Sequence, residues 1–191
     1  MTTLMILTVL GAIIGGFILV ILLWAISCYN RLVHLKALLN EAWSGIEVQL
    51  KRRYDLIPNL IATVKGYNTH EKELFENIAQ LRASAMRATS ISEKREFESA
   101  LTTSLKNLMI IVEQYPELKA NTNFLHLQTE LSAIEGEIQL SRRYYNGTAR
   151  NFNSSVASFP TTIIARMYGF ETAAYFELTN PQERETPKVQ F

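Results

Sequence analysis

Few residues of this sequence could serve as catalytic groups or metal ligands, and their spacing does not match known catalytic or metal-binding motifs. His70 and Glu71 begin like the His-Glu-x-x-His motif of zinc proteases, but Leu74 stands where the second histidine would be. The other two histidines, His34 and His126, are widely separated from this pair in the sequence. We therefore do not expect a zinc-protease site.

A second candidate is the pair of carboxylates at Glu135 and Glu137. Dinuclear metal sites in helical bundles use a Glu-x-x-His pair on each of two helices, and Ile138 stands where the histidine would follow Glu135. The sequence also lacks a Cys-x-x-Cys pair, a glycine-rich phosphate loop and a Gly-x-Ser-x-Gly motif. We expect no catalytic residue, no metal and no cofactor, and therefore no enzyme.

The basic run Lys51-Arg52-Arg53 invites a role in binding anionic lipid. If its helix leaves a membrane after Ser27, a rise of about 1.5 Å per residue places Lys51 about 36 Å away, which is several Debye lengths. We expect instead a solvated charged face, or pairing with acidic residues of this protein or of a partner. The balance of 19 basic and 18 acidic residues gives no reason to expect nucleic-acid binding.

The helix that carries the basic run is predicted to begin in a membrane. Residues 4–26 form an almost wholly apolar run of about 23 residues, where a membrane span needs roughly 20. The run lacks the basic start and the cleavage site of a signal peptide, and the lipid-attachment reading of Cys28 lacks the same basic start. We therefore expect residues 1–28 to be an uncleaved transmembrane anchor.

The flanks of the anchor predict its orientation. Trp24 and Tyr29 stand where amphipathic rings favour the headgroup layer, and Arg31 and Lys36 follow on the same side. The positive-inside rule then places the N-terminus outside and the rest of the chain in the cytoplasm, as a single-pass protein of the cell inner membrane.

Within the span, Gly11 and Gly15 fit the small-xxx-small pattern that lets membrane helices approach closely. Glycines are also common in membrane helices without any such role. We predict these two residues as an oligomerisation contact and expect a homo-oligomer with membrane lipids as its other partner.

After the anchor, apolar steps of three and four residues predict an all-α fold, an elongated antiparallel four-helix bundle over residues 29–158. We expect helices over about 29–65, 68–89, 90–115 and 124–159. Pro58 should kink the first, Gly66 should end it, and Ser90 with Glu93 should form a capping box. Two helices are long and two are short, so the membrane-proximal half should be a two-helix stalk that packs against neighbouring copies.

Residues 159–178 should then return to the bilayer as an amphipathic, membrane-proximal segment. Its apolar residues include Ile163, Ile164, Met167 and Phe170. They either cap the base of the bundle or lie in the headgroup layer, and we predict them as interface residues. The polar residues 179–191 should be a flexible tail. The glycosylation-like motifs at Asn146 and Asn153 fall on a packed helix and are treated as chance.

Several segments resemble the LemA family over about residues 28–178, with Glu47 standing where we would expect Asp. The segments that carry the resemblance are Glu41–Leu60 (EAWSGIEVQLKRRYDLIPNL), Val64–Tyr67, His70-Glu71, Tyr115–Asn121 (YPELKAN), Asn123–Leu125, Leu127–Leu131, Arg142-Arg143, Tyr145-Asn146, Phe159-Pro160, Gly169-Phe170 and Phe176-Glu177. The resemblance implies an N-terminally anchored bacterial membrane protein with an antiparallel helical bundle. Some relatives belong to magnetosome membrane-biogenesis systems and some are encoded near membrane metallopeptidases. It supplies no catalytic residues.

Two functions fit these expectations. The first is a membrane-anchored, self-associating scaffold that organises or remodels the bacterial inner membrane. The second is a monomeric adaptor that presents its helical bundle to a partner, such as a membrane protease or a signalling protein.

Overall fold

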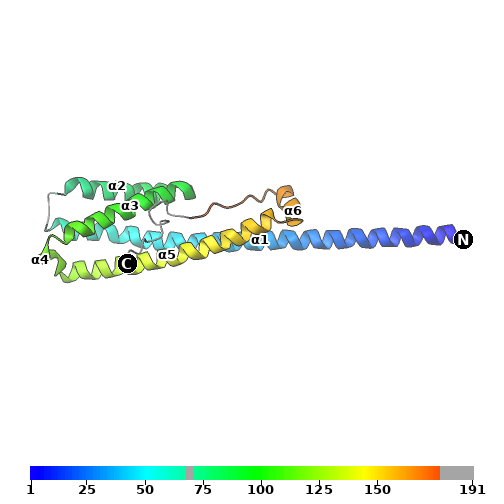
Figure 1. Ribbon diagram of the computed structural model, residues 1–191, viewed down its shortest axis with the longest axis horizontal. Coiled ribbons are helices and arrows are strands. Elements are labelled where there is room, and N and C mark those ends of the chain that lie inside the picture. Colours follow the sequence, from blue (N-terminus) through cyan, green and yellow to red (C-terminus); the bar gives the residue numbers. More distant parts are fainter. Residues whose placement is uncertain (68–70, 177–191) are drawn as a thin grey trace, which may run out of the picture. The chain divides into compact units, whose positions relative to one another are not determined.

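The computed structural model describes residues 1–67 and 71–176, and all regular elements in these ranges are α-helices. The helices, labelled in Figure 1, are α1 (Thr2–Lys65), α2 (Lys72–Arg87), α3 (Ile91–Val112), α4 (Pro116–Lys119), α5 (Thr122–Ala157) and α6 (Thr161–Met167). The prediction of an all-α protein with one long apolar N-terminal helix is confirmed. The predicted tail, 179–191, and the predicted helix start at Asn68 lie outside the described residues.

The first helix, α1, is continuous through the apolar run and beyond it. It ends at Lys65, directly before Gly66, where the sequence predicted the end. Pro58 lies inside α1, which is helical on both sides of it, and the kink predicted nearby stays a prediction.

The connection between α2 and α3 is short, and the two helices lie side by side in Figure 1. Ser90 caps α3: its hydroxyl accepts from the Glu93 backbone N–H at 3.1 Å, and the Glu93 carboxylate accepts from the Ser90 N–H at 3.4 Å. This is the predicted capping box, which satisfies two backbone donors that the helix itself leaves without partners.

The chain beyond α3 differs in detail from the prediction. The third helix ends at Val112 rather than near Tyr115, and Pro116 begins the short helix α4, which was not predicted. Tyr115 lies outside the helical region, with a φ of −120° and a ψ of 85°, because the helical conformation is disfavoured for a residue before proline. Asn121 then caps α5 by accepting from the Phe124 N–H at 3.1 Å.

By its contacts the chain divides into two compact units, to which α1 and α5 both contribute. Unit 1 comprises Met1–Glu41 and Gly147–Ala173. Unit 2 comprises Ala42–Asn146 and, among the described residues, 174–176. In unit 1 the buried apolar side chains are Leu32, Leu39, Ala149, Phe152, Val156, Ile164 and Ala165. In unit 2 they follow steps of three and four along α1 and α3, and steps of three, four and seven along α5, as a packed helical face requires.

Candidate functional site

The N-terminal part of unit 1 is an exposed apolar helix. Large hydrophobic side chains from Leu4 to Ile26 are exposed, and the most apolar 18-residue window of α1 has a mean hydropathy of 2.9. Water would solvate such a surface at a large free-energy cost, whereas lipid chains cover it favourably. The helix therefore indicates a single-pass membrane anchor.

The glycines predicted as an oligomerisation contact lie on this exposed part of α1. Gly11 and Gly15 are four residues apart and so share one face of the helix. Apart from the adjoining residues and the backbone of its own helical turns, a Cβ atom added at either position would meet no atom of the described residues within 4 Å. The face they form is therefore open for another helix to approach.

An aromatic cluster follows the apolar run in unit 1. The ring of Tyr29 lies 4.7 Å from that of Tyr168 and 6.0 Å from that of Phe170. Phe170 in turn lies 6.4 Å from Phe152, and the Lys36 ammonium sits 5.4 Å from the Phe152 ring centre. These contacts pack residues 168–170, which follow α6, against α1 near Tyr29.

The turn that brings Phe170 into the cluster depends on a glycine. Gly169 follows α6 with a φ of 70°, which is a left-handed conformation that other residues adopt at a cost. Its N–H donates to the Arg166 carbonyl at 3.4 Å, and the Phe170 N–H donates to the Ala165 carbonyl at 2.9 Å. This pair of bonds is a Schellman motif, which ends the helix and fixes the direction of the following chain.

The residues predicted at the membrane interface occupy different environments in unit 1. Ile163 and Met167 are exposed, at 48% and 72% of their accessible surface, whereas Ile164 is buried and Phe170 is half-buried. Trp24, Tyr29, Arg31 and Lys36 are all exposed. The short helix α6 therefore has one face packed inside unit 1 and one apolar face available to another surface.

Asn153 holds the chain that follows the aromatic cluster. Its amide oxygen accepts from the Ala173 N–H at 2.7 Å, and its amide nitrogen donates to the Ala173 carbonyl at 2.9 Å. The side chain thus binds both polar groups of one backbone residue. The glycosylation-like motif at this position has a structural role within unit 1.

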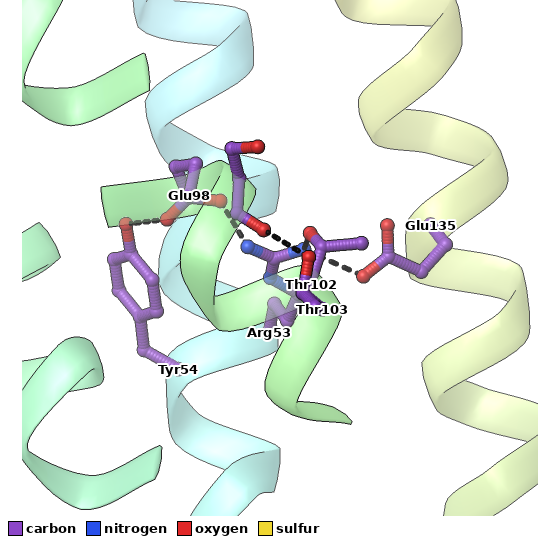
Figure 2. A network of polar contacts seen from close by, with 7 residues as sticks. Arg53, Tyr54, Glu98, Thr102, Thr103 and Glu135 are labelled. Atoms are coloured by element: carbon purple, nitrogen blue, oxygen red, sulfur yellow. Dashed lines mark hydrogen bonds and ion pairs between the residues drawn. The ribbon is translucent and has the colours of Figure 1, made fainter. Parts of the chain in front are cut away.

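A buried polar network lies in unit 2 and is drawn in Figure 2. The Arg53 guanidinium, with no exposed surface, donates to a carboxylate oxygen of Glu98 and to Glu135 Oε1, the latter at 2.6 Å. The same group donates to Thr102 Oγ1 at 3.2 Å, and the Tyr54 hydroxyl donates to the other oxygen of Glu98. The network joins α1 to α3 and α5.

The charges of this network are partly balanced. Arg53 carries one positive charge between two carboxylates, of which Glu98 is fully buried and Glu135 is 31% exposed. Burial, and then the negative charge of Glu98, raise the pKa of Tyr54 well above its usual value, so the phenol stays protonated and keeps donating. The backbone carbonyl of Tyr54 accepts from Arg82 Nε at 2.7 Å, which joins α2 to the same part of α1.

This network was not predicted from the sequence, although the sequence contains a signal for it. In the sequence of α1, steps of three and four residues from Leu50 lead to Arg53 and then to Ile57, so that Arg53 stands at a core position between two apolar residues. On α3, Glu98 likewise stands three residues before the buried Leu101. A charged residue at a core position of each of two helices indicates a buried ion pair. The neighbours Lys51 and Arg52 are exposed, so the expected solvated face describes two of the three basic residues.

This network is not arranged as a metal centre. Across residues 1–67 and 71–176, no group of three or more His, Cys, Asp or Glu side chains could hold a metal ion. Glu135, considered above as a metal ligand, is instead bound to Arg53. What the arrangement does chemically is to neutralise buried charges and to specify which helices face one another.

The sequence matches the LemA family over residues 42–191. A protein named LemA from Metamycoplasma hominis is 30% identical over 149 residues, which cover 78% of this chain and 68% of that protein. The magnetosome protein MamQ 2 of Paramagnetospirillum magneticum is 24% identical over 175 residues, and MamQ of Magnetospirillum gryphiswaldense is 23% identical over 174. Both alignments cover 78% of this chain and 64% of the relative, so the chain spans about two thirds of these proteins. Since the family match covers more than half of the chain and includes the residues of the buried network, the chain belongs to the LemA family.

Proposed function

We propose that this chain is a membrane-anchored, self-associating helical scaffold that organises or remodels the bacterial inner membrane. The observation that carries the proposal is the apolar start of α1, whose side chains are exposed over residues 4–26. Lipid covers most of such a helix, and the open face at Gly11 and Gly15 suits contact with a second copy. Membership of the LemA family and similarity to the MamQ proteins support a membrane-associated helical protein.

In this proposal residues 29–158 form an antiparallel four-helix bundle on the cytoplasmic side, and the N-terminus lies outside. The contacts of Arg53, Tyr54 and Arg82, which join α1 to α2, α3 and α5 within unit 2, support the bundle. Arg31 and Lys36 after the span support the orientation.

The exposed face of α6 has a place in the same proposal. Ile163 and Met167 are exposed on it, and Tyr168 beside it contacts Tyr29 at the end of the apolar run. The headgroup layer accommodates apolar and aromatic side chains next to polar atoms. We propose that this face and the rings of Trp24 and Tyr29 lie in that layer, and that the role is non-catalytic.

A second candidate is a monomeric adaptor that presents its bundle to a partner protein. The observation that favours it is a groove of about 470 Å³ between α3 and α5 in unit 2. Its apolar lining includes Leu105, Met109, Ile110 and Leu131, and Ile110 is largely exposed. An apolar groove of this size on a helical surface suits a helix or side chain of a partner.

The mass of the full chain, purified in mild detergent and measured by native mass spectrometry, separates the two candidates. The scaffold predicts an oligomer, and replacing Gly11 and Gly15 together with leucine should weaken it by about 1–2 kcal/mol per contact. Ala25→Leu is the matched control, because Ala25 lies in the same span and has no small residue four positions before or after it. A wild-type chain that is monomeric both in detergent and in vesicles would instead support the adaptor.

A further inference from the structure

Unit 2 contains a side-chain cluster that binds a short extended stretch of the chain, residues 174–176. Asn146 on α5 binds both backbone groups of Phe176: its oxygen accepts from the N–H at 2.8 Å, and its nitrogen donates to the carbonyl at 3.1 Å. The Tyr145 hydroxyl donates to the Ala174 carbonyl at 2.8 Å. These bonds replace those that a neighbouring strand would make with an extended peptide. They involve only backbone atoms of the bound stretch, so they do not depend on its side chains.

One side chain of the bound stretch is recognised. Phe176 is 1% exposed, and its ring lies 5.7 Å from that of Trp43 and 4.8 Å from the Arg142 guanidinium carbon. Ala174 and Tyr175 are exposed. The cluster therefore selects an aromatic residue at one position and tolerates other side chains at the two positions before it.

Two walls of this cluster are side chains of helices. Trp43 and Tyr145 belong to the long helices α1 and α5, and their rings contact each other at 5.5 Å. The ammonium group of Lys94 lies 5.7 Å from the centre of the Trp43 ring. Burial raises the pKa of Tyr145, so its hydroxyl stays protonated and able to donate. The bound stretch itself lies outside any helix.

We infer that Trp43, Arg142, Tyr145 and Asn146 form a binding site for an extended peptide segment with an aromatic residue, which this chain occupies with its own residues 174–176. The chain's own segment is a tethered ligand, and the tether gives it an effective concentration in the millimolar range. A free peptide of the same pattern binds weakly while the tethered segment is in place and binds well when its aromatic anchor is removed. The inference goes beyond the scaffold role and does not depend on self-association.

The test uses the full chain in detergent, with Trp24→Phe so that Trp43 is the fluorescent reporter. A capped peptide of residues 172–176 (TAAYF) is titrated into the Phe176→Ala chain and into the chain with Phe176 intact. We expect saturable binding to Phe176→Ala, with an apparent affinity at least about tenfold higher than for the chain with Phe176, since the tether no longer competes. A peptide ending in alanine should not bind, and Asn146→Ala added to Phe176→Ala should abolish the gain.

A second measurement does not require a variant without the aromatic anchor. Asn146→Ala should increase the quenching of Trp43 by acrylamide, whereas Asn151→Ala, an exposed asparagine on the same helix, should leave it unchanged. Helical content by circular dichroism checks that each variant is folded. The inference is overturned if the peptide does not bind folded Phe176→Ala, or binds both chains equally. It is also overturned if adding a second full-length copy to the Phe176→Ala chain changes the Trp43 fluorescence and adding the peptide does not.

Discussion

Replacing Arg53 with methionine should destabilise unit 2 by about 3–5 kcal/mol, the usual cost of removing one partner of a buried ion pair. Neither Arg53 nor Glu98 has exposed surface, so the variant leaves the Glu98 carboxylate buried with the Tyr54 hydroxyl as its remaining partner in the network. Glu135 is 31% exposed and can regain water, so Glu98 accounts for most of the loss.

The double variant Arg53→Met with Glu98→Leu should cost less than the single variant. It removes the buried charge, and relative to the single variant it adds only the loss of the acceptor of the Tyr54 hydroxyl, a cost of about 1–3 kcal/mol. Thr102 loses its bond with Arg53 in both variants. Methionine and leucine are close in volume to the groups that they replace, which limits cavity formation.

The assay is urea unfolding of the full chain in detergent, followed by Trp43 fluorescence in the Trp24→Phe background. Arg52→Met is the matched control, because Arg52 is exposed next to Arg53 and its replacement should change the free energy of unfolding by less than about 0.5 kcal/mol. Equal losses for Arg53→Met and Arg52→Met would refute the argument, and so would a double variant less stable than Arg53→Met alone.

Three further predictions follow from local structure. Because the pKa of Tyr54 is raised in the folded chain, the unfolded chain loses this proton first as the pH rises above the ordinary value of 10.0. The free energy of unfolding should therefore fall there by up to about 1.4 kcal/mol per pH unit. Urea midpoints measured between pH 9 and pH 11 should fall less steeply for Tyr54→Phe. Ser90→Ala should cost about 0.5–2 kcal/mol by removing the cap of α3, while Thr89→Ala should cost little in the same assay. A reporter that is active only in the cytoplasm should give signal when fused after residue 191, and a reporter active only outside should not; the reverse pattern would invert the proposed orientation.

Local rules predicted much of the helical structure. The apolar run, Gly66 and the Ser90–Glu93 box mark where helices lie, begin or end, because each acts through neighbouring residues. The short helix α4 was not predicted, because its four residues fall between the expected helices at 90–115 and 124–159; Pro116 suits the first turn of a helix.

Side-chain partners were harder to predict because they depend on which helices face one another. Arg53 and Glu98 are 45 residues apart, and Asn146 and Phe176 are 30 apart. A charged residue at a core step can be read from one helix, but its partner cannot be named without the packing of the others. The asparagine contacts carry no periodic signal, since each binds backbone atoms that every residue possesses.

Self-association in a bilayer is the central claim of the proposed function. The most direct measurement counts photobleaching steps of a fluorescently labelled chain in the bacterial inner membrane, at low expression and with the unlabelled copy deleted. The scaffold predicts spots that bleach in two or more steps, and Gly11→Leu with Gly15→Leu should shift the distribution toward single steps. Spots that bleach in a single step for the wild-type chain, at every expression level tested, would contradict the account.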